Sequence, residues 1–208
     1  AKSAPQWTLP KGATDAEIDA LAKQLNVTLP EELRMSLKRH NGVEDGKWPT
    51  YTLMSIKGIE GTWSWLTGDM DEGEFDFADK IESNGTYQAV FWCNKWVPID
   101  GFEGTGSVID LAPGPKGQVG QILYFSIEEG PCEMNFSDYP SYLEDIADQL
   151  EKGRFSVDLK RDILSEKVDK KNVENENDEE ENDEDEDKDE KDEDEAEESD
   201  KKKKKVKK

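Results

Sequence analysis

The chain has 208 residues and a formal net charge of −23. Residues 1–168 carry 29 acidic and 16 basic side chains, a net charge of −13, and residues 169–208 carry 21 and 11, a net charge of −10. An acidic domain repels nucleic-acid phosphates, so we expect no direct nucleic-acid binding by the folded part. No apolar run approaches 18 residues, which argues against a membrane span.

The composition divides the chain into two parts. All six tryptophans lie in residues 1–168, which we expect to form one folded domain. Residues 169–208 contain no aromatic side chain and are predicted to be a disordered tail. The tail is acidic from Glu174 to Asp200 and ends in a lysine-rich tip, Lys201–Lys208. This tip could act as a nuclear import signal, touch an anionic surface, or fold back on the acidic block.

Two cysteines, Cys93 and Cys132, are too few for a disulfide scaffold and fit a reducing compartment. Cys93 sits in an apolar run and is expected to be a core residue. No signal peptide is visible, and we therefore predict a cytoplasmic protein.

The first part of the domain predicts two helices. Thr14 and Glu17 have the spacing of a capping box and precede an apolar helical face. A second helix starts near Pro30, which is followed by acids that favour a helix N-terminus. Asn41-Gly42 ends it, since either residue can adopt the left-handed conformation.

The rest of the domain alternates apolar runs with turn residues. We expect a strand at 51–56, a short helix at 63–66, a helical segment at 75–84 and a turn at Asn84-Gly85. Strands are predicted at 87–93, 95–99, 107–111 and 120–127, then a helix capped by Ser137 or Asp138 and a last helical segment at 156–168. Helices at both ends with strands between them predict an α+β fold.

The glycine-rich stretch 96–125 resembles a nucleotide-binding loop at first sight. A P-loop requires Lys-Ser/Thr after its last glycine and a helix next. Here Lys116 precedes Gly117 and a strand is expected to follow, which favours glycines that shape strand connections. We therefore predict no nucleotide cofactor.

The sequence gives little support for a calcium site, a zinc site or a catalytic histidine. Residues 69–79 are acidic, but counting from Asp69 the sixth and twelfth EF-hand positions are Glu74 and Lys80 instead of Gly and Glu. A solvated acidic loop is the preferred interpretation. One histidine and two distant cysteines cannot form a conventional zinc site. His40 has no nucleophile paired with it in the sequence, so we predict neither a metal nor an enzyme.

Three motifs together resemble the SUKH superfamily, and more narrowly its Smi–Knr branch: L-P-E-E-L-R-M-S-L-K-R-H-N-G (29–42), W-V-P-I-D-G (96–101) and V-I-D-L-A-P-G-P-K-G-Q-V-G-Q-I (108–122). The resemblance covers about residues 14–153. It implies an α+β domain with a central, mostly antiparallel, curved sheet and helices packed on it. The acidic and lysine-rich tail is not part of the family pattern.

The resemblance also implies a non-enzymatic binding function. Many bacterial members are immunity proteins that neutralise a cognate secreted polymorphic or contact-dependent toxin, and fungal members are regulatory scaffolds that link cell-wall synthesis to signalling. We expect an immunity protein whose negative charge suits a basic toxin or nuclease domain. The alternative is a regulatory scaffold with an interaction tail, and the acidity could equally reflect solubility. No oligomeric state is predicted.

The candidate residues fall into two sets. The expected partner contacts lie in or near the motifs or are tryptophans, which are enriched at binding hot spots. They are His40, Asn41, Trp48, Trp96, Asp100 and Glu103. By resemblance, the fold-defining positions are Gly42, Pro98, Asp110, Pro113, Gly114, Gly117, Gly120 and Gln121.

Overall fold

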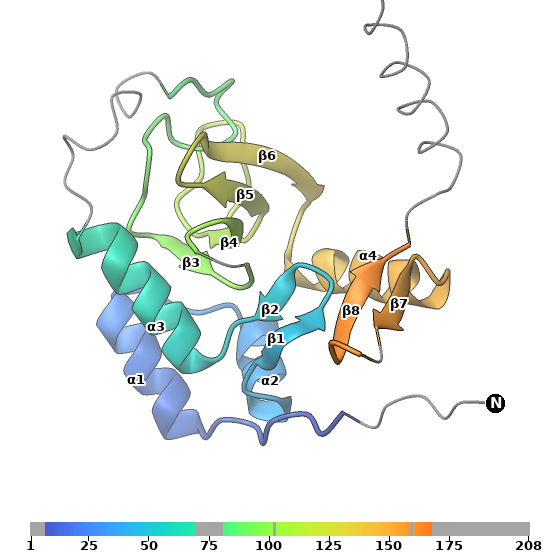
Figure 1. The fold of residues 1–208 in the computed structure, drawn as a ribbon. Coiled ribbons are helices and arrows are strands. Elements are labelled where there is room, and N and C mark those ends of the chain that lie inside the picture. Colours follow the sequence, from blue (N-terminus) through green and yellow to red (C-terminus); the bar gives the residue numbers. More distant parts are fainter. Residues whose placement is uncertain (1–6, 70–80, 102, 159, 168–208) are drawn as a thin grey trace, which may run out of the picture. The chain divides into compact units, whose positions relative to one another are not determined.

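The computed structural model describes residues 7–69, 81–101, 103–158 and 160–167 (Figure 1). Its helices are α1 (Asp15–Leu25), α2 (Glu31–Arg39), α3 (Ile56–Ser64), which continues into a π-helical segment (Trp65–Asp69), and α4 (Tyr139–Glu151). Its strands are β1 (Val43–Trp48), β2 (Tyr51–Leu53), β3 (Trp96–Pro98), β4 (Gly106–Asp110), β5 (Ile122–Ser126), β6 (Gly130–Phe136), β7 (Phe155–Asp158) and β8 (Ile163–Glu166).

The described strands pair only in the antiparallel sense. They form a central sheet in the order β3-β4-β5-β6 and two hairpins, β1-β2 and β7-β8. Figure 1 shows α1 and α3 side by side, with α3 next to β3. The predicted α+β class is thus confirmed.

Local capping explains where two of the helices begin. Thr14 and Glu17 form the predicted capping box of α1, in which Glu17 N–H donates to the Thr14 hydroxyl and the Glu17 carboxylate accepts from Thr14 N–H at 2.7 Å. Asp138 caps α4 by accepting from Ser141 N–H at 2.8 Å. Each interaction satisfies backbone donors that a helix leaves unpaired in its first turn.

The central sheet is buried on both faces. Alternation along β4 and β5 sends Ile109 and Ile122 into one core and Val108 and Leu123 into another. The first core contains the apolar faces of α1, α2 and α4, and the second contains Trp96, which is fully buried. This double burial explains why the strands read as continuous apolar runs in the sequence.

The predicted helix at 156–168 is wrong, because β7 and β8 form a hairpin there. The Asp158 carboxylate accepts the N–H groups of Lys160 and Arg161, at 2.8 and 3.3 Å, and turns the chain. Asp162 then adopts a left-handed φ of 57°, which no helix interior contains. Local turn chemistry therefore overrides the apolar spacing of this segment.

The predicted strand at 87–93 is also wrong. This segment is irregular and lies against the second face of the sheet instead of pairing with its edge. The Phe91 and Trp92 rings pack edge-to-face on Phe125, with centroids 5.3 and 5.1 Å away. Aromatic residues favour strands in general, but here they pack in the second core.

Three further differences concern short elements. The strand expected at 51–56 ends at Leu53, because Ser55 caps α3 and starts a helix there. The short helix predicted at 63–66 coincides with the end of α3 and the start of the π-helical segment. β1 and β6 were not predicted. The helix expected at 75–84 and the acidic stretch 69–79 lie largely outside the described residues.

Candidate protein-interaction surface

The glycine-rich connection between β4 and β5 packs on the backbone of residues 84–87. Gly114 N–H donates to Thr86 O at 3.0 Å, and Lys116 N–H donates to Gly85 O at 2.8 Å. A Cβ added at Gly117 would stand 1.9 Å from Thr86 O. The lack of a side chain at Gly117 therefore allows two backbone segments to approach closely.

Asp110 and Gln121 close the base of this connection. The buried Asp110 carboxylate accepts from Ala112 N–H at 2.9 Å and from the Gln121 amide at 3.0 Å. The same Gln121 nitrogen donates to Thr86 O at 2.9 Å. Burial raises the pKa of Asp110 above its ordinary value, against the lowering effect of these hydrogen bonds.

Two of the expected partner contacts are inside the domain, and this corrects their assignment. Trp96 is fully buried, and Asp100 is 1% exposed. Asp100 accepts from the Thr50 hydroxyl and from Ser107 N–H, both at 2.7 Å, and from the Tyr142 hydroxyl. Neither Trp96 nor Asp100 offers a surface to a partner in this conformation.

Burial raises the pKa of the Asp100 carboxyl, while its hydrogen bonds from Tyr142, Thr50 and Ser107 act in the opposite direction. Burial and the neighbouring Asp100 carboxylate also raise the pKa of Tyr142. These groups connect the β1–β2 turn, the β3–β4 connection and α4. Their geometry fits a structural hydrogen-bond cluster.

The other expected contacts are dispersed. His40 Nδ1 lies 3.0 Å from Pro10 O, and the Asn41 side chain accepts from Ile56 N–H at 2.8 Å at the start of α3. Trp48 is half-buried against the first core, and Glu103 is exposed on the connection after β3. The six residues therefore do not form one continuous surface.

A groove that the sequence did not reveal lies between the starts of two helices and the glycine-rich connection. It has a volume of 710 Å³. We call it the α2–α4 groove. Its lining residues come from three segments. These are residues 28–32 before and in α2, residues 138–140 at the start of α4, and Leu111 with residues 118–120 from the connection. Val119, near the β5 end of the connection, is 68% exposed.

The charged side chains that line the α2–α4 groove, within the described residues, are all acidic: Glu31, Glu32 and Asp138. Hydrogen bonds from Ser141 hold the pKa of Asp138 below its ordinary value, so its carboxylate stays charged at neutral pH. The groove therefore combines apolar contacts with a negative rim.

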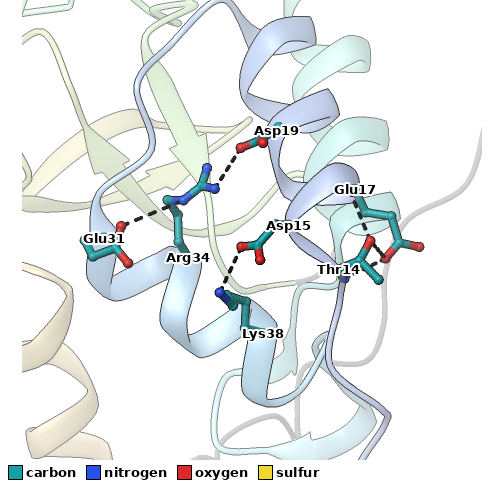
Figure 2. Close-up of polar contacts among 7 residues, drawn as sticks. All are labelled: Thr14, Asp15, Glu17, Asp19, Glu31, Arg34 and Lys38. Carbon is teal, nitrogen blue, oxygen red and sulfur yellow. Dashed lines mark hydrogen bonds and ion pairs between the residues drawn. The ribbon is translucent and has the colours of Figure 1, made fainter.

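Two cations of α2, Arg34 and Lys38, are directed toward α1, as Figure 2 shows. Arg34 pairs with Asp19 at 2.7 Å and more loosely with Glu31 at 3.8 Å, and Lys38 pairs with Asp15 at 2.9 Å. In the described part of the chain Glu32 forms no ion pair. The negative charge of the groove is thus only slightly compensated by its own helix.

The described residues contain no group of three or more His, Cys, Asp and Glu side chains placed to hold a metal ion. Burial raises the pKa of the Cys93 and Cys132 thiols, which keeps both protonated at neutral pH. The helices in the described segments are all too short or too polar to cross a membrane.

Sequence comparisons give the family context. Residues 12–152, from just before α1 to just after α4, match the SMI1 / KNR4 family (SUKH-1). The chain is 32% identical over 164 residues to the cell wall biosynthesis/cell cycle regulator smi1 of Schizosaccharomyces pombe, covering 71% of this chain and 32% of the relative. It is 26% identical over 189 residues to the glucan synthesis regulatory protein of Neurospora crassa, covering 72% and 36%.

A third relative, the KNR4/SMI1 homolog 2 of Debaryomyces hansenii, is 25% identical over 191 residues, with 71% of this chain and 32% of the relative covered. The chain thus spans about a third of the length of these curated relatives. The S. pombe and N. crassa relatives are described as regulators, which fits the regulatory alternative better than the immunity function. The family match covers more than half of the sequence, and the chain therefore belongs to the SMI1 / KNR4 family (SUKH-1), as its motifs predicted.

Proposed function

We propose that this chain is a non-enzymatic, cytoplasmic protein-interaction module that takes part in the regulation of cell-wall biosynthesis. The observation that carries the proposal is the similarity, over about 70% of the chain, to fungal proteins described as regulators of cell-wall biosynthesis and glucan synthesis. This replaces the immunity function as the preferred interpretation.

The geometry of the described residues supports a binding function. The α2–α4 groove has an exposed aliphatic side chain, Val119, and a negative rim. Apolar contact supplies affinity and charge supplies selectivity in protein association. The thiols, whose pKa values are raised by burial, lack the lowered pKa of an activated cysteine nucleophile.

A chimera tests the regulatory function. In S. pombe, the matching segment of the smi1 relative is replaced by residues 12–152 of this chain, and growth is measured in the presence of a cell-wall-digesting glucanase. We expect resistance close to that of the intact relative and well above that of a deletion strain. A chimera that accumulates to the normal level and still behaves as the deletion strain would contradict the proposal.

The tail is proposed as an accessory to a domain that ends near residue 168. Its composition cannot form a hydrophobic core, whereas both cores are built from residues before 147. Truncation after Val168 should leave the urea midpoint of the domain unchanged. A loss of cooperative unfolding in the truncated chain would show that the boundary is misplaced.

A further inference from the structure

The α2–α4 groove presents Val119 on a connection that is fixed on both sides. Gly120 N–H donates to Asp110 O at 2.7 Å, and the Gln118 side chain donates to Ser137 O at 2.9 Å, just before α4. Lys116 Nζ donates to Asn84 O at 2.8 Å. An aliphatic side chain that is 68% exposed on such a connection costs little conformational entropy when it is covered.

The charge around Val119 selects the partner. Glu31, Glu32 and Asp138 line the groove, and its described lining includes neither a basic side chain nor a histidine. A second copy of this domain, with its net charge of −13, would be repelled. A partner segment with lysine or arginine side chains would instead be attracted.

The start of α2 favours a partner in an extended conformation. Pro30 precedes α2 and provides no side-chain cap, so the first backbone N–H groups of the helix lack an internal acceptor. An extended segment has free carbonyl oxygens that can accept from such groups, whereas a helical segment uses its own carbonyls internally.

From these three features we infer that the α2–α4 groove binds an extended segment of a partner protein in which basic side chains alternate with aliphatic ones. The aliphatic side chains cover Val119 and the apolar part of the groove, and the basic ones pair with Glu31 and Glu32. This inference rests on the proposed function as a protein-interaction module and adds the site and the chemistry of the partner.

Binding of labelled peptides to the complete 208-residue chain tests the inference. The probe is the peptide S-K-L-K-I-K-S, and S-K-S-K-S-K-S is its control with the same charge and no aliphatic side chains. The control is needed because the acidic residues between Glu174 and Asp200 also attract cations. We expect the aliphatic peptide to bind at least fivefold more tightly, as measured by fluorescence anisotropy.

Two pairs of matched variants locate the binding. Glu31→Gln with Glu32→Gln should weaken binding of the aliphatic peptide about tenfold, whereas Glu128→Gln with Glu129→Gln, an equal charge change in the exposed β5–β6 turn, should change it less than twofold. Val119→Ser should weaken it about fivefold, and Val90→Ser, at another exposed valine, should have no effect.

Thermal unfolding of each variant confirms that it is folded, which is expected for exposed positions. Equal binding of the two peptides, or equal affinity of the groove variants and their controls, would overturn the inference. A photo-reactive leucine in the probe should crosslink to residues 28–32, 118–120 or 138–140, and crosslinks confined to other segments would also overturn it. Neither failure would affect the chimera's growth phenotype, so the two proposals are tested separately.

Discussion

Acidic side chains have different environments in the sheet and in the α2–α4 groove. Asp100 and Asp110 are buried, and their oxygens accept hydrogen bonds from three and two neighbouring groups. Glu31 and Glu32 are exposed, and Glu32 has no ion-pair partner among the described residues. The difference indicates that the buried carboxylates stabilise the fold, whereas the exposed ones are available for binding.

The largest expected effect comes from removing the buried acceptor. Asp100→Ala leaves the Thr50 hydroxyl, Ser107 N–H and the Tyr142 hydroxyl without their acceptor, and should lower the free energy of unfolding by about 3 kcal/mol. Urea denaturation measures the change. Glu128→Ala, at an exposed position, is the control and should have almost no effect. If the two variants had similar free energies of unfolding, the conclusion that buried acids stabilise the fold and exposed acids do not would be contradicted.

A pair of glycine variants tests the close packing beside Asp110. Gly117→Ala should destabilise the domain by about 2 kcal/mol, because a Cβ would collide with Thr86 O and displace the backbone. Gly61→Ala, within α3 and with open space around its Cβ position, should stabilise it by about 0.5–1 kcal/mol. Thermal unfolding distinguishes them by opposite shifts, and a shift of the same sign would contradict this packing.

The pH dependence of stability separates Asp100 from the exposed acids. Its pKa is raised in the folded chain, so the folded state binds more protons, and stability falls as the pH rises from about 4 through the folded pKa. The amide introduced by Asp100→Asn does not titrate. The stability of the wild type relative to this variant should therefore decrease between pH 4 and 7, by about 1.4 kcal/mol for each unit of the pKa difference.

Asp138 provides the opposite case, because its pKa is lowered. Its contribution is present above the unfolded value near 4 and is lost as the pH falls through the folded value. The stability of the wild type relative to Asp138→Asn should thus decrease on acidification. If the stability difference between wild type and variant changed with pH in the same direction for Asp100 and Asp138, the opposite pKa shifts of the two carboxylates would be contradicted.

The smallest effect is expected for the exposed ion pairs between α1 and α2. Lys38→Gln and Arg34→Gln remove the contacts with Asp15 and Asp19 that Figure 2 shows. Exposed pairs contribute little, because water and salt screen them. We expect the urea midpoints to change within experimental error, and any residual change to vanish at high salt. A change comparable with that of Asp100→Ala would contradict this ranking.

The sequence was most informative where local chemistry decides the structure. The Thr14 capping box and the Asp138 cap located α1 and α4, and the motifs identified the family. The hairpin of β7 and β8 was missed because Val157, Ile163 and Leu164 also fit a helical face, and the decisive turn at Asp158 was not recognised. The strand predicted at 87–93 is absent because the tertiary packing of its aromatic rings outweighs their strand propensity.

The groove could not be derived from the sequence, because its three segments are separated by about 80 and 20 residues along the chain. The one available signal was Val119, an aliphatic residue inside a run rich in glycine and proline. Burial of Asp100 was equally hidden, since an acid between a strand and Gly101 is typical of an exposed turn. Both features depend on long-range contacts that a single sequence does not contain.

The Asp100 cluster has a consequence for the motion of α4. Tyr142 is buried in this helix, and its hydroxyl donates to a carboxylate 42 residues earlier in the chain. Detaching α4 alone would leave Asp100 without that donor and would expose Tyr139, Tyr142 and Ile146 to water. The amides of α4 should therefore exchange with solvent deuterium only through openings whose free energy is close to that of unfolding the whole domain. One wall of the α2–α4 groove then remains rigid when a partner binds.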